Sequence, residues 1–387
     1  MAGTKKLYYK DAYLREFCAR VLSCTPCADG MFNVVLDETA FYPEVGGQPA
    51  DLGALGAARV MDVQLQGEAV VHRTTAPLRV GETVQGNIDW ARRFDHMQQH
   101  TGEHITSGII KSRFGFDNLG FHMGRESVVL ECSGQLDAAQ LERAEQLVNE
   151  AIWQDLPVRA WWPEPEELDR LEYRSKRKLT GAVRIVQAAG VDSCACCGTH
   201  VSSTGQVGMV KILHFQRYKG GVRLWILCGD RALADYRRKN ADIYRLSELF
   251  SAKPQELAPA AQRLLEEQEH LKQQLAAAQR QLWALRAAGI PEGTPLALSF
   301  EEGLDPAQLR RLCLAFCERA GLAAVFSGGP QGWKYAVGSA QRDVRELGKR
   351  LNQRFAGRGG GQKELVQGTL AASRRELEAF FREEAGE

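Results

Sequence analysis

The spacing of hydrophobic and polar residues changes several times along the chain, and each change indicates a different kind of structure. Residues 1–88 contain short apolar runs, such as Phe32–Leu36, which alternate with turn residues. Runs of this length bounded by turns are typical of β-strands. Two adjacent glycines, Gly46 and Gly47, mark a place where the backbone must turn sharply or approach a ligand closely. The sequence therefore predicts a mostly β N-terminal domain.

From about Trp90 the pattern becomes helical, and Leu141–Ile152 predicts a further helix. Residues 182–230 return to short apolar runs, which indicate strands and turns. We therefore expect a second domain over residues 89–250 that mixes helices and strands.

Residues 254–290 are rich in Gln, Glu, Ala and Leu, and neither Gly nor Pro occurs between Pro259 and Gly289. One set of positions is spaced alternately by four and three residues, which is the spacing of a coiled-coil seam. A paired or hairpin helix is favoured over a single amphipathic helix packed on its own chain, because the seam is long and regular. The seam consists of Leu257, Ala261, Leu264, Gln268, Leu271, Leu275, Ala278, Leu282 and Leu285.

The remaining residues, 291–387, predict a C-terminal α/β domain. The pattern indicates helices over Leu309–Arg319 and Arg342–Phe355, strands over Ala323–Phe326 and Trp333–Val337, and a loop over Gly357–Lys363 before a final charged helix.

Composition adds little to this organisation. Apolar residues make up 44% of the chain and charged residues 25%, which is an ordinary globular balance. The net charge of +1 neither requires nor excludes a nucleic-acid partner. The segment Met1–Phe17 lacks the apolar run of a signal peptide, and no stretch approaches the length of a membrane span. We therefore expect a cytoplasmic protein with reduced thiols, in which a cysteine cluster indicates metal binding or catalysis.

The candidate chemistry is a metal site. His100 and His104 are four residues apart on a predicted helix, so both imidazoles can reach one ion. Cys196 and His200 form a second close pair, and zinc favours four such ligands. The alternative is that the histidines are ordinary core or surface residues, but three of the eight histidines fall within nine positions. The spacing alone does not choose among Cys194, Cys196 and Cys197.

Two neighbours of these histidines have open roles. His96 shares the helical stripe one turn earlier, and we expect it beside the site or at the surface rather than as a ligand. Glu103 is either an acceptor that orients an imidazole or a solvated carboxylate on the helix face. The order His-Thr-Gly-Glu-His differs from the metalloprotease pattern His-Glu-x-x-His, so a protease is not expected.

Several motifs resemble the editing domain of alanyl-tRNA synthetase. The segment Asp37–Asp51 resembles its "FYPxxGGQPxDxG" block, and His100–His104 matches its "HTxxH". The segment Cys196–Val201 matches its "CGGTHV", with Cys197 in place of a glycine. Residues Gly357–Gly368 resemble the glycine-rich block of the DHH-associated domain of the synthetase. The order is preserved over nearly the whole chain, while the aminoacylation and anticodon-side helical domains are absent.

The chain thus resembles the long, free-standing alanyl-tRNA editing proteins of the AlaX-L type. The resemblance implies an α+β fold with an N-terminal β-barrel-like domain (1–88), a zinc-containing editing domain (89–250), a coiled-coil linker (254–290) and a DHH-associated-like α/β domain (291–387).

The same resemblance implies roles for particular residues. It makes Cys196 the cysteine ligand, so that one zinc ion would be held by His100, His104, Cys196 and His200. It places Gln48, Gly46 and Gly47 in the editing pocket, and it links Thr39 to serine discrimination.

The implied substrate is tRNA(Ala) wrongly charged with serine or glycine, and the reaction is hydrolysis of the ester to the terminal ribose. A synthetase pocket rejects a near-isostere by only about a hundredfold, so a second hydrolytic site is needed. Thr39 and Gln48 are candidates to bind the serine hydroxyl. Zinc either lowers the pKa of a bound water to about 7 or holds the amino acid while a free water attacks. No residue is a convincing nucleophile, so no covalent intermediate is expected.

For the C-terminal segment, RNA contact fits the sequence better than nucleotide hydrolysis does. Lys363 is flanked by Gln362 and Glu364, which does not fit a phosphate-binding P-loop. A basic surface that contacts tRNA and a merely solvated basic surface are equally consistent with this composition. The resemblance favours a homodimer through this region. The basic residues are Arg354, Arg358, Lys363, Arg374 and Arg375.

Two other functions fit parts of this pattern. A zinc-stabilised tRNA-binding protein without hydrolysis would need only a closed structural site. A metal-dependent hydrolase of a small ester or amide would need the same ligands with a different pocket. Deacylation of charged tRNA separates both from the editing function.

Overall fold

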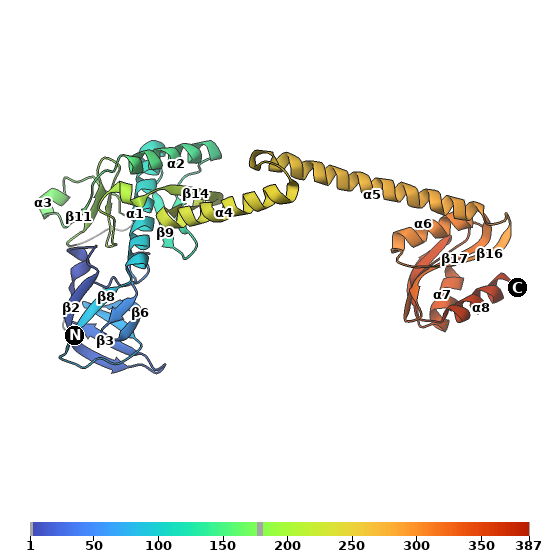
Figure 1. Ribbon diagram of the computed structural model, residues 1–387, viewed down its shortest axis with the longest axis horizontal. Coiled ribbons are helices and arrows are strands. Elements are labelled where there is room, and N and C mark those ends of the chain that lie inside the picture. Colours follow the sequence, from blue (N-terminus) through green and yellow to red (C-terminus); the bar gives the residue numbers. More distant parts are fainter. Residues whose placement is uncertain (1–2, 176–180, 387) are drawn as a thin grey trace. The chain divides into compact units, whose positions relative to one another are not determined.

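The computed structural model describes residues 3–175 and 181–386 (Figure 1). The chain divides into two compact units, Met1–Arg245 and Leu246–Glu387. Both units contain helices and β-sheet, so the fold is of the α+β class.

The N-terminal part of the first unit is a six-stranded barrel, drawn in blue in Figure 1. All of its neighbouring strands pair antiparallel. Along the first strand, buried apolar side chains alternate with exposed residues. Phe17, Ala19 and Val21 are buried in this way along the first strand. The strands close in the order β2 (Glu16–Pro26), β3 (Phe32–Leu36), β7 (Ala69–Thr74), β6 (Ala58–Gln66), β5 (Gly53–Leu55) and β8 (Thr83–Ile88).

The block that follows β3 is held against the barrel and the next helix by a buried ion pair. The short strand β1 (Lys5–Lys6) pairs in parallel with β4 (Glu38–Thr39), where this block begins. Further along it, Asp51 accepts hydrogen bonds from the guanidinium of Arg93, and neither side chain is exposed. Arg93 also donates to the carbonyl of Ala40, so one arginine ties the motif to the helix.

The helix α1 (Trp90–Phe114) is the centre of the first unit. Asp89 caps its first turn by accepting from the backbone N–H of Arg92, and Gly115 ends it in the left-handed conformation. Every residue from His96 to Ile110 is buried, although many of them are polar. Buried polar groups need hydrogen-bond partners, so the surrounding elements must supply them.

Two sheets and two helices surround α1. The two sheets and α2 share one apolar core with α1, to which Met97, Ile105 and Ile109 contribute from the helix, whereas α3 has no buried residue. One sheet has the order β14 (Val210–Tyr218), β15 (Gly221–Cys228), β10 (Val128–Cys132), β9 (Asn118–Met123); the other has β11 (Val158–Trp161), β12 (Ile185–Ala188), β13 (Asp192–Ala195); the helices are α2 (Ala138–Trp153) and α3 (Pro165–Leu168).

The second unit contains a five-stranded sheet covered on both faces. One core packs α6 and the end of α5 on the sheet, and the other packs α7 and α8. α4 (Gly229–Phe250) and the 3-10 turn η3 (Pro254–Glu256) precede it. The strand order is β16 (Thr294–Glu301), β17 (Ala320–Gly329), β18 (Gly332–Gly338), β20 (Leu365–Leu370), β19 (Arg358–Gln362), and the helices are α5 (Leu257–Ala288), α6 (Pro306–Cys317), α7 (Arg345–Arg354) and α8 (Arg374–Ala385).

The expected loop over Gly357–Lys363 is wrong, because most of it forms the strand β19. Glycine makes this pairing possible, since a Cβ on Gly359 would lie 2.6 Å from the hydroxyl of Tyr335, and one on Gly361 would lie 2.2 Å from the carbonyl oxygen of Leu365. The glycines therefore serve close strand packing rather than loop flexibility.

The predicted seam of α5 forms a continuous helix, as expected. Its C-terminal end packs on α6 through Trp283 and Ala287, which are not seam positions. Seam leucines stay open, and Leu285 is 72% exposed. Pairing of the seam with another helix stays a prediction.

Candidate metal centre

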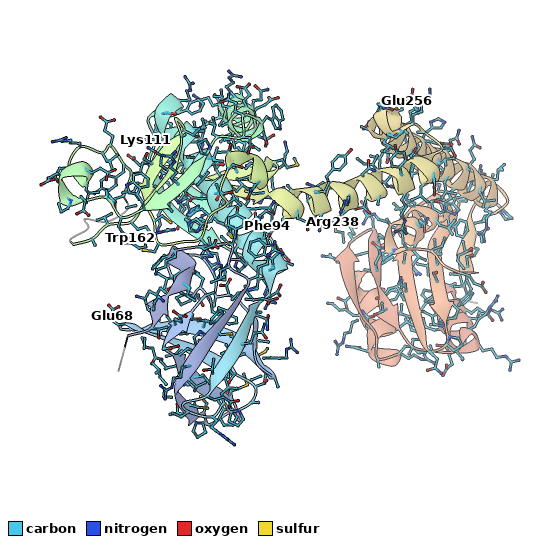
Figure 2. All side chains as sticks on the ribbon, turned by 60° about the vertical axis from the view of Figure 1, so that its left-hand side comes forward. Glu68, Phe94, Lys111, Trp162, Arg238 and Glu256 are labelled. Carbon is cyan, nitrogen blue, oxygen red and sulfur yellow. The ribbon has the colours of Figure 1, made fainter. Side chains whose placement is uncertain are left out.

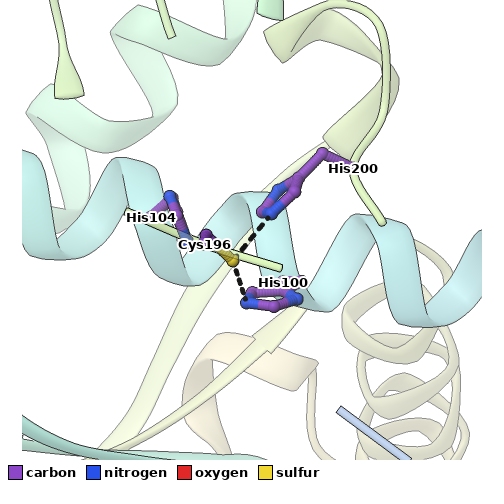
Figure 3. Close-up of side chains that lie close together, drawn as sticks. All are labelled: His100, His104, Cys196 and His200. Atoms are coloured by element: carbon purple, nitrogen blue, oxygen red, sulfur yellow. Dashed lines mark hydrogen bonds between the residues drawn. The ribbon is translucent and has the colours of Figure 1, made fainter. Parts of the chain in front are cut away.

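The four residues predicted to hold a metal come together although two distant segments supply them. α1 provides His100 and His104, and the loop after β13 provides Cys196 and His200 (Figure 3). Their ligand atoms all lie within 4.8 Å of one another. The sulfur of Cys196 lies 3.4 Å from Nε2 of His100 and 3.4 Å from Nε2 of His200.

This spacing fits a small tetrahedral cation. Ligand atoms that are about 2.0 to 2.3 Å from a tetrahedral zinc ion lie roughly 3.3 to 3.8 Å from each other. One thiolate and three imidazoles are also the donor types that zinc prefers. The residues present therefore fit a zinc ion in both chemistry and spacing.

Each imidazole is fixed by a partner on its outer nitrogen. A partner on Nδ1 orients the ring and leaves Nε2 free to face the centre, as is usual for metal-bound histidine. The pairs are His100 Nδ1 with Gln48 Oε1 at 2.9 Å, His200 Nδ1 with Thr101 Oγ1 at 3.1 Å, and His104 Nδ1 with Asp192 Oδ2 at 3.3 Å.

Gln48 reaches the site from the block after β4. Its Oε1 accepts from His100 and also from the backbone N–H of Thr199, 3.1 Å away. Its Nε2 donates to the hydroxyl of Thr199 at 2.8 Å. The amide thus links the helix to the ligand loop, and it acts on the centre through His100.

Asp192 behaves as an ionised acceptor for His104. Burial raises the pKa of this carboxyl, but hydrogen bonds from His104 and Arg174 outweigh burial and hold the pKa below its usual value. Arg174 binds it in a bidentate manner, with Nε–Oδ1 at 2.6 Å and Nη2–Oδ2 at 2.7 Å. Sequence reasoning missed Asp192, Arg174 and Thr101, because nothing in their spacing connects them to the histidines.

The ionisation of Cys196 and His200 suits a cation, whereas at His104 the Cys196 thiolate and the hydrogen bond with Asp192 outweigh burial and raise the pKa well above its usual value. Burial alone would raise the pKa of the Cys196 thiol, but the charges of the three histidines and a hydrogen bond from His100 bring it well below its usual value. Burial lowers the pKa of His200 to about 3. A thiolate beside a neutral imidazole is the state in which these ligands bind metals.

The two glycines of the GGQP motif have different surroundings. A Cβ on Gly47 would lie 2.7 Å from the ring of Phe121, which stacks on His100 with centroids 5.0 Å apart. Gly46 has a φ of +66° but open space around it. Gly198 of the ligand loop is still tighter, since its Cβ would lie 2.2 Å from His100. Gly198 therefore lets the backbone approach the imidazole of His100, and Gly47 lets it approach the Phe121 ring that stacks on this imidazole.

Thr39 is buried in the barrel rather than bonded to the four-residue cluster. Its hydroxyl lies 2.8 Å from Nε2 of His72 and accepts from the N–H of Phe41 at 3.1 Å. Nδ1 of His72 is 3.1 Å from the carbonyl of Val34, so Nδ1 donates there and Nε2 accepts from Thr39. Burial lowers the pKa of His72 to about 4, which keeps this imidazole neutral.

The open roles of Glu103 and His96 are partly decided by burial. Glu103 is only 2% exposed, so the solvated carboxylate is wrong. It accepts hydrogen bonds from Ser107 and Asn118, and its Oε2 lies 3.8 Å from Nε2 of His104. His96 is also buried, and burial lowers its pKa to about 3. Of the two positions expected for it, beside the site or at the surface, burial excludes the surface.

Two family models match segments of the first unit. The family model for class II (A) tRNA synthetases matches residues 15–92, and the model for the second additional domain of threonyl and alanyl tRNA synthetases matches residues 183–225. The second range contains Cys196 and His200.

Two relatives align with this chain over nearly the whole length of both proteins. The alanyl-tRNA editing protein AlaX-L of Pyrococcus horikoshii is 30% identical over 96% of this chain and 96% of its own. The alanyl-tRNA editing protein Aarsd1 of Mus musculus is 31% identical over the same shares. This chain belongs to the alanyl-tRNA editing protein family. The alanine–tRNA ligase of Pyrococcus abyssi is 28% identical over 95% of this chain and 42% of the ligase.

The second unit of this editing protein carries the basic residues that were predicted to contact tRNA. Arg354 ends α7 and pairs with Glu383 at 3.2 Å. Arg358 begins β19, and Lys363 lies in the turn after it. Their contact with tRNA stays a prediction. Among the described residues, no helix is long and apolar enough to cross a membrane.

The second unit also has another basic surface, which the sequence analysis did not predict. A cavity of about 400 Å³ lies between α5 and α6, with Trp283 and Leu314 among its apolar lining. Arg280, Arg311 and Arg319 also line it, and none of the three has an ion-pair partner among residues 3–175 and 181–386. We call this surface the α5–α6 groove. Its arginines come from different elements, so no sequence run reveals them.

The outer partners make a prediction about metal affinity. Replacing Asp192→Asn removes the carboxylate that orients His104, and we expect zinc affinity to fall roughly 10- to 100-fold. Competition with a chelating dye measures this, with Asp169→Asn on the exposed surface as the matched control.

Elemental analysis gives the stoichiometry in the same preparations. The unaltered chain should hold close to one zinc equivalent, and the His104→Ala, Cys196→Ala double variant should hold none. An unchanged affinity in Asp192→Asn, or zinc retained by the double variant, contradicts the assignment.

Proposed function

We propose that this protein is an aminoacyl-tRNA deacylase that hydrolyses the ester of tRNA(Ala) wrongly charged with serine or glycine, using one zinc ion per chain. Membership of the alanyl-tRNA editing family supports the reaction and the tRNA. The observation that carries the zinc site is the cluster of His100, His104, Cys196 and His200 with a partner on every outer imidazole nitrogen.

The residues of the chain prepare this centre before a substrate arrives. Gln48, Thr101 and Asp192 hold three imidazoles so that their Nε2 atoms face one point. Orientation of this kind lowers the cost of reorganisation during the reaction. When bound, zinc supplies Lewis-acid chemistry, which suits hydrolysis of an ester.

A covalent route through the neighbouring cysteine is not favoured. Burial raises the pKa of the Cys197 thiol, and the adjacent Cys196 raises it further. The thiol therefore stays protonated at neutral pH and is a poor nucleophile. Direct attack by water is the simpler route.

The second candidate is a tRNA-binding protein whose zinc only stabilises the fold. Four protein donors around one ion are typical of structural sites, which favours this candidate. A deacylation assay separates the two. We expect release of serine from Ser-tRNA(Ala) to be faster than release of alanine from Ala-tRNA(Ala), and to stop when a chelator removes the metal.

The assay has a clear opposite outcome. If zinc-loaded protein binds Ser-tRNA(Ala) but releases serine no faster than buffer, the binding protein is the correct assignment.

Thr39 makes a prediction about selectivity. Its hydroxyl hydrogen goes to His72, so a serine hydroxyl would have to donate to the remaining lone pair on Thr39 Oγ1. Thr39→Val removes this acceptor at similar volume, and we expect the ratio of Ser-tRNA(Ala) to Ala-tRNA(Ala) deacylation rates to fall.

Thr39→Ser is the matched control, because it keeps the hydroxyl. It should preserve most of the rate ratio while removing only a methyl group. Equal ratios in the valine variant and in the unaltered protein would exclude a role for Thr39 in discrimination.

The α5–α6 groove makes a prediction about tRNA affinity. Three unpaired arginines beside an apolar floor suit phosphate and base contacts. Replacing Arg280, Arg311 and Arg319 together by Gln should weaken tRNA binding and flatten its salt dependence, by up to roughly 0.9 in the logarithmic slope for each phosphate that the variant no longer neutralises.

The control removes the same charge from ion-paired arginines. Arg238, Arg345 and Arg350 each pair with a carboxylate, so their replacement by Gln should change the slope less. Similar slopes for the two triple variants would show that the groove does not bind tRNA. A parallel triple variant of Arg354, Arg358 and Lys363 tests the surface predicted from the sequence.

A further inference from the structure

The loop that carries the predicted ligands is held by an arginine from the neighbouring strand end. Nη1 of Arg184 donates to the carbonyl of Cys196 at 2.9 Å and to the carbonyl of Gly198 at 2.8 Å. The backbone carbonyl of Arg184 in turn accepts from the N–H of Cys196 at 3.0 Å. This side chain therefore lies directly against the candidate metal centre.

Arg184 carries a charge that nothing in the described structure neutralises. It is only 6% exposed, and it forms no ion pair within residues 3–175 and 181–386. Its Nε–H is buried and has no hydrogen-bond acceptor there. A buried cation without an anion is costly, so such a site favours a negatively charged ligand.

Two aromatic rings lie beside the same guanidinium. Its central carbon is 5.2 Å from the ring of Tyr9 and 5.6 Å from the ring of Trp162. The two rings meet edge to face, with centroids 5.0 Å apart. Figure 2 shows Trp162 at the margin between the barrel and the part of the unit that surrounds α1.

Trp162 is the accessible member of this group. It is 44% exposed, although it is a large apolar side chain beside the predicted reaction centre. An open indole ring next to an unneutralised arginine combines the two features that bind a nucleotide, which are stacking on the base and a positive charge for the phosphate.

We propose that Trp162 and Arg184, supported by Tyr9, form a binding subsite for the 3′-terminal nucleotide of the tRNA. The base stacks on the indole of Trp162, and the guanidinium of Arg184 faces the phosphate of the same nucleotide. This inference rests on the proposed deacylase function, because the ester to be hydrolysed is attached to the ribose of that nucleotide.

The location of the subsite agrees with this chemistry. The ribose joins base, phosphate and ester, so all three must bind within one nucleotide of the reaction centre. Arg184 spans this interval, since it contacts the backbone of Cys196 on one side and Trp162 on the other. Binding energy from the nucleotide would hold the ester in place for attack.

Stacking can be measured without hydrolysis. We propose to use full-length protein and uncharged tRNA(Ala) with 2-aminopurine as its last base, because stacking on an aromatic ring quenches the emission of this base. Quenching is expected with the unaltered protein and with Trp162→Phe, and it should disappear with Trp162→Ala. Trp153→Ala is the matched control, since Trp153 is an exposed tryptophan on α2.

Kinetics provide the second measurement. Removal of one base–aromatic stack should lower kcat/KM for Ser-tRNA(Ala) roughly 5- to 150-fold in Trp162→Ala, mainly through KM, and Trp162→Phe should recover most of it. Zinc content should stay unchanged. The proposal is overturned if Trp162→Ala quenches 2-aminopurine as much as the unaltered protein does. It is also overturned if kcat/KM falls no more in Trp162→Ala than in Trp153→Ala.

The charge of Arg184 is tested by salt dependence. Arg184→Gln should reduce the logarithmic salt slope of tRNA binding by about 0.7, the value for one contact to a single strand, whereas Arg184→Lys should keep it. An unchanged slope in zinc-loaded Arg184→Gln overturns the phosphate contact.

The proposed function and this subsite fail in different ways. If the unaltered protein quenches 2-aminopurine but does not release serine, the deacylase assignment is wrong while nucleotide binding stands. If it releases serine without quenching, the deacylase stands and the stacking subsite is wrong.

Discussion

The structure of the first unit depends on one constraint, which is that a helix buried on all sides contains mostly polar side chains at its centre. Each buried imidazole, amide and carboxylate of α1 needs a partner, since an unpaired buried polar group costs about 1 to 3 kcal/mol. Several neighbouring elements supply these partners, although Nδ1 of His96 has none among the described residues. The block after β4 supplies Gln48, β13 supplies Asp192, and β9 supplies Asn118.

Buried ion pairs also join the elements around α1. Asp51 and Arg93 fix the GGQP block to the start of α1. Arg174 holds Asp192 of β13, and Asp192 in turn contacts His104 in the middle of α1. Removing either partner of a buried pair leaves an uncompensated charge, which is costly. The pairs thereby hold the outer acceptors of the imidazoles in register. The centre is positioned by the whole unit rather than by its four predicted ligands alone.

Close backbone approach is the second requirement of the site. Gly198 has no room for a Cβ because the ring of His100 occupies that space. Its carbonyl and that of Cys196 are bound by Arg184, so the same loop that supplies ligands also supplies anchoring points. Arg184 also lies beside the half-exposed ring of Trp162, so the proposed nucleotide subsite adjoins the loop that supplies the ligands.

The sequence by itself predicted several helices and strands and the four residues that come together, although it did not predict α4. Helical spacing aligned His100 with His104, and the short Cys196–His200 separation formed the other half. Motif resemblance, rather than spacing, selected Cys196 among three cysteines. These features are local, because a period or a separation of a few residues fixes which side chains share a face.

Only the tertiary structure decided the rest. The outer partners of the imidazoles and the pairing of Thr39 with His72 join segments that are far apart in the sequence. The burial of Glu103 depends on the elements around α1, because the helical pattern alone allows both a buried and an exposed carboxylate. The glycine-rich composition suggested a loop before α8, whereas the segment forms the strand β19, which pairs with β20. Its glycines are needed because side chains there would clash with β20 and Tyr335. Composition describes the freedom of a segment, but packing decides which conformation satisfies its backbone and its neighbours.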